Sequence, residues 1–288
     1  IDCFQTEIKK HNIDVLTNQA LVDFEKENDQ WVVSTKSEKF ITNSLVIAAG
    51  SSPKLWKLIQ SKGHNIINPV PSLFTFNIKD NRLTDIPGVV AQDVEVKVLD
   101  TNLESTGPLL ITHWGLSAPS ILKLSAWGAR TLSDKNYKFD ISINFIGFAT
   151  DDCLNKLKEL KQEMAKNLVV KYNQFEMPKR LWRKLIEASQ ISDTTRWADL
   201  TKNQLENLAN QLTNAIFKVD GKSTFKEEFV TAGGVDLKEI NFKRFESKVH
   251  KNLFFAGEVL NIDAVTGGFN FQNAWTGGYL VAKAISES

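Results

Sequence analysis

The sequence has few cysteines and histidines and no long apolar run. Cys3 and Cys153 lie far apart, and the four histidines are scattered, so neither residue type shows the clustered spacing of a metal site. Two isolated cysteines suit a reducing compartment, and we expect a cytoplasmic protein. No stretch approaches the roughly 18 apolar residues of a membrane-spanning helix. Residues 1–10 contain neither a signal peptide nor a starting methionine, so we expect that the numbering begins inside a longer protein.

An excess of charge of one sign is also missing. The chain has 35 Lys and Arg against 34 Asp and Glu, a formal net charge of +1. This balance gives no general electrostatic attraction to nucleic acid or to an anionic membrane. The basic residues within 179–184 are typical of the solvated face of a helix. We therefore expect a small-molecule substrate, with neither nucleic acid nor membrane as partner; the sequence leaves the oligomeric state open.

Four familiar motifs are absent as well. The sequence contains no G-x-G-x-x-G, P-loop, H-E-x-x-H or G-x-S-x-G pattern. Without the first, the chain lacks the usual phosphate-binding turn of a nicotinamide dinucleotide or of the ADP half of FAD. The last two would have indicated a zinc protease and a serine hydrolase.

The 288 residues exceed the usual size of one domain, and the pattern of apolar and polar residues changes twice along the chain. Residues 1–68 contain the apolar run Ser44–Ala49, which does not alternate and therefore predicts a strand buried on both faces, as in a parallel sheet. Residues 223–288 show the same pattern again, with a second apolar strand and a terminal helix from Gly268. We expect these two segments to form one α/β domain.

Residues 69–222 differ, and we expect them to form an insert in that domain. Short alternating strands broken by prolines predict an antiparallel sheet or small barrel over residues 69–150. Residues 151–213 are amphipathic and predict helices, one of which begins with a capping box at Thr201. A strand over residues 214–222 then leads back to the first domain.

The strongest chemical signal is the apolar strand Asn252–Ala256, which is followed by Gly257 and Glu258. In open α/β sheets, ligands bind beyond the carboxyl ends of the strands, where a glutamate can accept hydrogen bonds from ligand hydroxyls. A glutamate at a strand end is also common as a merely solvated residue. Gly257 and Glu258 are therefore candidate ligand contacts, and the sequence after them favours this interpretation.

That continuation places Thr266, Gly267 and Gly268 directly before a predicted helix that opens with Phe269 and Asn270. Glycines there leave backbone N–H groups uncovered at the positive end of the helix dipole, which suits electron-rich oxygen atoms. A glycine-capped helix that only packs tightly is the alternative. The helix face that we expect to pack closely against the sheet or a ligand contains Phe271, Ala274, Gly278, Ala282 and Ile285.

Two further glycine-containing segments and one histidine are weaker candidates. Gly233 and Gly234 permit positive φ and a close backbone approach to a planar ligand, although a bulge or a turn uses such a pair equally. Ala49 and Gly50 end the first apolar strand, where a backbone can touch a cofactor. His113 lies in a polar and aromatic turn where an acid or a substrate contact fits; a structural histidine is the more usual role.

The blocks FVTAGGVDLKEI (residues 229–240), ESK (246–248) and 253–273, with its AGEVL and the start of TGGFNFQNAW, occur in a specific order and spacing. Together with residues 46–50 and 109–117, they resemble the BaiN-like NAD(P)/FAD-dependent oxidoreductases of bacteria. The resemblance implies an FAD/NAD(P)-binding three-layer α/β fold with an insert, and a flavin held by the candidate residues above. The sequence departs from the family pattern at two places: it has Ala49-Gly50-Ser51 where the family has Thr-Gly-Gly, and Ser117-Ala118-Pro119 where the family has Ser-Gly-Pro.

In that family an N-terminal strand, glycine-rich turn and helix bind the ADP moiety, and this βαβ unit is absent from the chain. We therefore expect a truncated fragment that is inactive alone and does not hold FAD. The function that the resemblance implies is hydride transfer through flavin, with NAD(P)H-dependent reduction of a small organic substrate. A flavin-dependent amine oxidase and a non-catalytic binding module on a flavoprotein fold remain alternatives.

Overall fold

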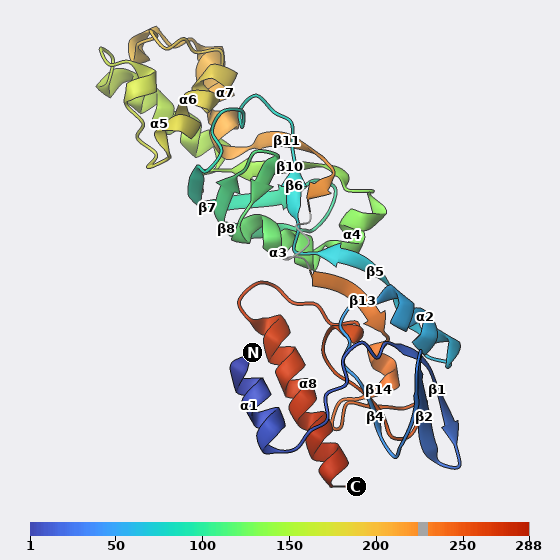
Figure 1. Ribbon diagram of the computed structural model, residues 1–288. Coiled ribbons are helices and arrows are strands. Elements are labelled where there is room, and N and C mark those ends of the chain that lie inside the picture. Colours follow the sequence, from blue (N-terminus) through green and yellow to red (C-terminus); the bar gives the residue numbers. More distant parts are fainter. Residues whose placement is uncertain (224–229, 288) are drawn as a thin grey trace. The chain divides into compact units, whose positions relative to one another are not determined.

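The computed structural model describes residues 1–223 and 230–287, and the chain divides into two compact units (Figure 1). Unit 1 contains Ile1–Ile66, Val235–Leu260 and Ala274–Ser288; unit 2 contains Ile67–Gly234 and Asn261–Asn273. The first boundary between the units follows Ile66, two residues before the boundary that we expected after residue 68. The return to unit 1 comes after Gly234 rather than after residue 222, and the segment before the C-terminal helix groups with unit 2.

A four-stranded sheet with the order β14-β15-β16-β4 lies in unit 1. Strands β4 (Leu45–Ile47) and β16 (Leu253–Phe255) are parallel neighbours, with Phe255 opposite Ile47. Strands β14 (Ile240–Asn241) and β15 (Glu246–Ser247) are antiparallel. All three side chains of β16 are fully buried, because the strand has a neighbour on each side.

Strand β4 corrects one expectation. It forms the edge of this sheet among the described strands, and Val46 keeps 41% of its surface exposed, whereas Ile47 is buried. The apolar run therefore does not give a strand covered on both faces. Successive side chains point to opposite faces, and at this edge strand the face with Ile47 is covered, whereas the face with Val46 is left open.

The remaining elements of unit 1 are a helix at each end of the chain, a three-stranded antiparallel sheet and one short helix (Figure 1). The short helix begins after Ser52, whose hydroxyl accepts a hydrogen bond from the Leu55 N–H, and Pro53 occupies its first turn. The bounds are α1 Asp2–Lys10, β1 Leu21–Glu27, β2 Gln30–Thr35, β3 Lys39–Thr42, α2 Pro53–Ser61 and, beginning in unit 2, α8 Phe269–Ser286.

Unit 2 contains an antiparallel sheet with the order β11-β10-β7-β8-β9-β6-β12 and a two-stranded sheet of β13 and β5. The described strands form an antiparallel sheet, the first of the two alternatives that we expected, in which no ladder joins β6 directly to β11. The bounds are β5 Ile66–Ser72, β6 Thr75–Asn77, β7 Val90–Val98, β8 Glu104–Ile111, β9 Gly115–Ser117, α3 Pro119–Trp127, α4 Ala129–Asp134, β10 Lys138–Asn144, β11 Ala215–Asp220, β12 Lys222–Ser223 and β13 Val230–Val235.

The three helices of unit 2 that follow β10 are α5 (Thr150–Glu163), α6 (Lys179–Ala188) and α7 (Lys202–Thr213). The capping box predicted at Thr201 is present: its hydroxyl accepts from the Gln204 N–H, and the Gln204 side chain accepts from the Thr201 N–H. Trp182 on α6 is fully buried and donates its indole N–H to the Val169 carbonyl. Within the described residues, no helix is long and apolar enough to cross a membrane.

Candidate functional site

The candidate residues of unit 1 lie where two parallel strands end. Because β4 and β16 run in the same direction, residues 48–50 and 256–258 leave the sheet at the same edge. The Ala256 N–H donates to the Ile47 carbonyl at 3.1 Å, which fixes the register up to that edge. The structure thus brings Ala49 and Gly50 together with Gly257 and Glu258 at the strand ends, the position at which open α/β sheets bind ligands.

Gly257 and its turn are held in place by unit 1 itself. Gly257 has φ +75°, a backbone conformation that residues other than glycine rarely adopt. A Cβ at this position would lie 3.7 Å from the Ala274 Cβ. The Trp56 indole N–H of α2 donates to the Val259 carbonyl at 2.9 Å. The turn after β16 therefore has a fixed backbone, which positions the Glu258 side chain.

Glu258 is half-buried and carries a carboxylate that its neighbours do not satisfy. Among the residues that the structure describes, it has no hydrogen-bond or ion-pair partner. Burial raises the pKa of its carboxyl group, because leaving water disfavours the charged form. Such a group costs stability unless a ligand supplies hydrogen-bond donors. The role of Glu258 as a ligand contact stays a prediction, and its half-buried position leaves the carboxylate within reach of a ligand or of water.

The glycines before α8 belong to unit 2 and are exposed. Gly267 and Gly268 have φ +123° and +85°, and α8 begins at Phe269, so the predicted order of glycine pair and helix start is confirmed. The Asn270 side chain accepts from the Ala264 N–H at 3.0 Å and donates to the Ala264 carbonyl at 3.1 Å. This clamp holds the loop that contains Thr266 and the two glycines against the first turn of the helix.

The helix α8 buries a different face from the one we expected. Gly277, Val281 and Ala284 are buried, whereas Gly278 is exposed. A Cβ on Gly277 would lie 3.1 Å from the Phe245 ring, whereas one on Gly278 would meet nothing within 4 Å. Close packing therefore explains Gly277 but not Gly278. A shift of one residue rotates the packed face by about 100°, which the weak apolar pattern did not resolve.

Gly233 and Gly234 lie inside strand β13 and are buried. A Cβ on Gly233 would lie 2.5 Å from the Pro69 Cα, so the close backbone approach that this glycine allows is to strand β5. The protein itself explains Gly233 without a ligand. The contact of this pair with a cofactor stays a prediction.

His113 is exposed on the turn between β8 and β9, and it makes no hydrogen bond to a described residue. Its ring lies beside that of Trp114, with centroids 6.0 Å apart. Water can satisfy the nitrogens of an exposed ring, so the position argues against a buried structural role, and contact of His113 with a ligand stays a prediction.

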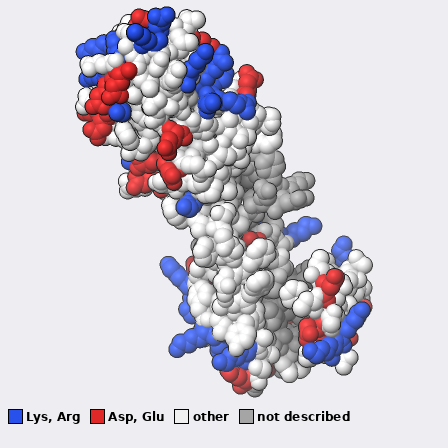
Figure 2. All heavy atoms as spheres, turned by 90° about the vertical axis from the view of Figure 1, so that its left-hand side faces the viewer, with Lys and Arg blue, Asp and Glu red and all other residues white. Residues whose placement is uncertain are grey.

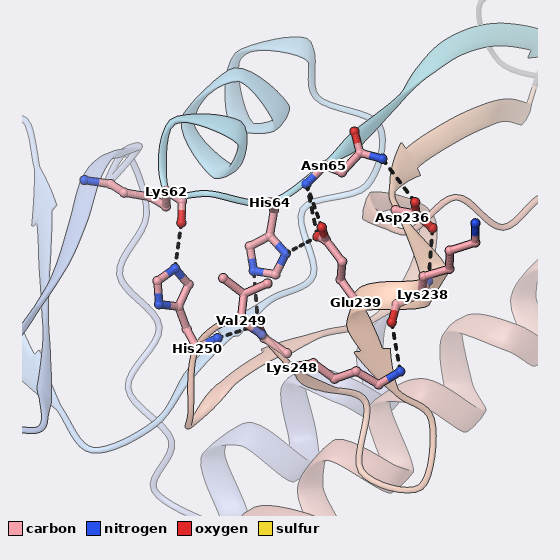
Figure 3. Close-up of polar contacts among 10 residues, drawn as sticks. Lys62, His64, Asn65, Asp236, Lys238, Glu239, Lys248, Val249 and His250 are labelled. Atoms are coloured by element: carbon pink, nitrogen blue, oxygen red, sulfur yellow. Dashed lines mark hydrogen bonds and ion pairs between the residues drawn. The ribbon is translucent and has the colours of Figure 1, made fainter.

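A buried hydrogen-bonded cluster in unit 1 escaped the sequence analysis. His64 points toward the Glu239 carboxylate, with Nδ1 2.8 Å from Oε2 (Figure 3). Its Nε2 lies 3.1 Å from the Ser247 hydroxyl. His64 lies more than 170 positions from both Glu239 and Ser247 in the sequence, and no local motif connects it to them. Only the pairing of β14, β15 and β16 beside the end of α2 brings them together.

The order serine, histidine, carboxylate resembles a hydrolase triad, but the bonds indicate a brace. Ser247 Oγ already accepts from the N–H groups of Val249 and His250, at 3.0 and 2.9 Å, so its hydroxyl donates to His64 Nε2. His64 Nδ1–H then donates to Glu239. Burial lowers the pKa of His64, and the nearby Glu239 opposes this effect without overcoming it. With His64 2% and Ser247 6% exposed, no substrate reaches the hydroxyl.

The described residues contain neither a metal-binding cluster nor a reactive buried thiol. No group of three or more His, Cys, Asp or Glu there could hold a metal ion. Cys153 is buried, which raises the pKa of its thiol to about 12 and leaves it protonated and unreactive at neutral pH. The groups at the ends of β4 and β16 and at the start of α8 remain the candidates for cofactor chemistry.

The parallel strand ends, the glycine turn and the helix start define a Rossmann-like α/β protein with mixed sheets. Residues 1–284 match the family described as HI0933-like protein Rossmann domain, and the chain belongs to this family of flavoprotein oxidoreductases.

Three curated proteins illustrate the range of its relatives. The ribosomal RNA dihydrouridine synthase of Haemophilus influenzae is 27% identical over 301 residues, which cover 99% of this chain and 72% of that protein. The 3-dehydro-bile acid delta(4,6)-reductase of Clostridium scindens is 23% identical over 301 residues, covering 100% of this chain and 73% of that protein. The ribosomal RNA dihydrouridine synthase of Escherichia coli is 25% identical over 299 residues, covering 99% and 71%.

Proposed function

We propose that this chain contributes the flavin-facing part of an FAD site and that the enzyme reduces a carbon–carbon double bond of an organic substrate, with NAD(P)H as hydride source. The observation that supports this most is Glu258, a half-buried carboxylate beyond the end of a parallel strand, without a protein partner among the described residues. FAD, when bound, supplies the hydride-transfer chemistry, and the protein binds and orients it.

Glu258 is proposed to accept hydrogen bonds from the ribityl hydroxyls of the cofactor. Its pKa is raised because burial disfavours the charge, and hydroxyl donors would offset that cost. The fixed turn at Gly257 reduces the ordering that the carboxylate must undergo on binding. This assignment agrees with the absence of a hydrogen-bond or ion-pair partner for Glu258 among the described residues.

The helix start at Gly267–Asn270 is proposed to face the electron-rich oxygen edge of the flavin ring. Uncovered N–H groups at a helix N-terminus stabilise negative charge, and this edge gains such charge on reduction. The Asn270 clamp keeps the loop and the helix start in one arrangement. Each of the two contacts is proposed within its own unit of the chain.

The names of the relatives support the reaction class. A dihydrouridine synthase and a delta(4,6)-reductase both saturate a carbon–carbon double bond. In such a reaction one carbon takes a hydride and the other a proton, and NAD(P)H supplies the two electrons and becomes NAD(P)⁺. His113 is proposed as a substrate contact or as the source of that proton, because it is exposed and carries a titratable ring.

The test is a visible absorbance spectrum of the protein expressed from its complete natural reading frame. We expect a bound flavin that NADPH bleaches without oxygen and that an unsaturated substrate re-oxidises. Oxygen consumption with an amine and no NAD(P)H would favour the amine oxidase instead. A colourless protein that takes up no added FAD would overturn the proposal.

A further inference from the structure

A cavity of about 780 Å³ lies in unit 2, on the side of the sheet where β6, β9 and β11 meet. Its walls are the loop after β6, the turn between β8 and β9, and the exposed side of β11. We refer to this cavity as the β6–β9 groove; the side chains used below are Asn77, Lys79, Asn81, His113, Trp114 and Lys218. All of them belong to one compact unit of the chain.

The walls of the groove are fixed by hydrogen bonds rather than left to loop motion. The Ile78 N–H donates to the Trp114 carbonyl at 2.9 Å, which joins the loop to the turn. The Arg82 guanidinium donates to both carboxylate oxygens of Asp80 in the loop and to the Ile216 carbonyl in β11. Its Cζ atom lies 3.8 Å from the centroid of the Phe217 ring, so Arg82 joins the loop to β11. The groove is therefore a pre-formed site, which lowers the entropic cost of binding.

The groove carries an excess of positive charge although the chain as a whole is nearly neutral. Its carboxylates are paired: Asp80 with Arg82, and Asp220 with Lys138 at 3.0 Å. Lys79 and Lys218 make no ion pair with a described residue. Both lysines line the cavity. Lys138 first, and then the charges of Lys79 and Lys218, lower the pKa of Asp220, so each of the two ammonium groups acts on this carboxylate.

An aromatic surface lies beside these two ammonium groups. Trp114 keeps 44% of its surface exposed, and the His113 ring is tilted 47° to it. The turn that presents both rings is held by Thr112, whose hydroxyl donates to the Gly115 carbonyl at 3.1 Å. Gly115 itself is required, since a Cβ there would lie 2.0 Å from the Phe76 carbonyl oxygen. The rings are therefore displayed at a fixed place.

We propose that the β6–β9 groove binds a nucleotide, with the base stacked against Trp114 and His113 and the phosphate between Lys79 and Lys218. The rings can stack on a base, the Asn81 amide can bind the base edge, and the two ammonium groups can bind a phosphate, which is the combination that a nucleotide requires. Asn77 Oδ1 already accepts from the Ser223 hydroxyl at 2.7 Å, which leaves the Asn77 NH2 group for the base edge. The inference deepens the proposed function and rests on it for the source of the nucleotide, which is either a nicotinamide dinucleotide or a single-stranded RNA.

Figure 2 draws a second charged surface of the molecule for comparison. On the face drawn at the top of Figure 2, the Lys and Arg side chains of this part of the molecule are interspersed with Asp and Glu. Mixed charge of this kind gives no net field for a phosphate backbone. We therefore expect a nucleotide in the groove and not on this surface of mixed charge.

The experiment measures binding of two probes to the 288-residue chain: a fluorescein-labelled decauridylate, followed by anisotropy, and NADPH, followed by its own fluorescence. The variants are Lys79→Gln with Lys218→Gln, and Trp114→Ala with Trp114→Phe as the conservative replacement. Lys158→Gln with Lys202→Gln is the matched control, because it removes the same charge from exposed positions on α5 and α7. Circular dichroism confirms folding of each protein.

We expect the double lysine variant and Trp114→Ala each to weaken one probe about tenfold, whereas Trp114→Phe and the control stay within about twofold. For RNA, the lysine variant should also lower the salt dependence by about 1.4 units of slope. Loss with the decauridylate alone identifies RNA as the source, and loss with NADPH alone identifies the dinucleotide; either supports the subsite. If neither probe binds the parent, or the folded variants bind as the control does, the proposal is wrong. These results need no flavin, so they stand apart from the spectrum that tests the oxidoreductase.

Discussion

Two polar groups flank strand β16, and they differ in what the surrounding protein does for them. His64 contacts the Phe255 ring, is buried, and has both ring nitrogens satisfied by Glu239 and Ser247. Glu258 lies three residues beyond the same phenylalanine, is half-buried, and has no described partner. The first arrangement is complete among the described residues, whereas the second leaves the carboxylate to donors from outside them, which are water or a ligand.

The difference separates structure from function at one strand. A polar group whose hydrogen bonds are all made internally stabilises the fold and needs no ligand. A group that pays for burial without partners is typical of a functional site, because the fold alone gives no reason to keep it there. The triad-like cluster is therefore a brace, and the less conspicuous glutamate is the candidate ligand contact.

Removing His64 should have the largest effect. His64→Ala deletes a buried ring and leaves Glu239 and Ser247 without their partner, so we expect a loss of about 3 kcal/mol in the free energy of unfolding. Urea denaturation followed by circular dichroism measures it, with Glu258→Gln as the control that leaves the brace intact. A loss below about 1 kcal/mol would show that His64 is not a brace.

Removing Glu258 should instead affect the cofactor. In the FAD-binding protein, Glu258→Ala removes charge-assisted hydrogen bonds worth about 1.5 to 3 kcal/mol, so FAD affinity should fall about tenfold or more while stability without FAD is kept. Gly267→Val blocks the helix start and should shift the flavin reduction potential more than the affinity. Titration with FAD and a redox titration separate the two. Parental behaviour of both folded variants would refute the assignment.

The chain as printed should hold FAD weakly, which sharpens the same contrast between a complete and an incomplete site. It contains the contacts proposed for the flavin side but no G-x-G-x-x-G turn for the pyrophosphate. We expect FAD added to the purified chain to separate from it during gel filtration. A yellow, stoichiometric protein peak would contradict this expectation.

Adjacent glycines on α8 provide a comparison with a smaller expected effect. Gly278→Ala meets open space and gains helix propensity, so it should stabilise the protein by up to about 1 kcal/mol. Gly277→Ala places a Cβ 3.1 Å from the buried Phe245 ring and should lose that gain or destabilise. Thermal unfolding of both variants is the measurement. Equal stabilisation by both would mean that the packed face is assigned incorrectly.

The pH dependence of stability should distinguish the two polar groups most subtly. His64 has a folded pKa below 6.5, so the unfolded state binds more protons there and stability falls as pH drops from 6.5 through the folded pKa. Glu258 has a folded pKa above 4.5, so its contribution is present below pH 4.5 and is lost as pH rises through the folded pKa. Urea unfolding across this range should show Glu258→Gln gaining on the parent as pH rises. An unchanged difference at all pH values would argue that Glu258 is solvated.

Much of the fold follows from local sequence. The bounds of α6, the capping box at Thr201, the strand before Gly257 and the glycine pair before α8 depend on residues within one or two turns of each other. Local patterns failed where burial depends on a neighbour. The exposure of Val46 reflects the edge position of β4, and the packed face of α8 is decided by Phe245.

The sequence by itself determined the placement of Gly257 and Glu258 after a buried strand and of two glycines before a helix, because strand and helix signals are local. Only the tertiary structure decided that Gly233 faces Pro69, that His64 is closed off between Glu239 and Ser247, and that His113 and Trp114 share a groove with Lys79 and Lys218. These contacts join residues that are distant in the chain, and their free energy depends on burial and hydrogen-bond partners that no local pattern contains.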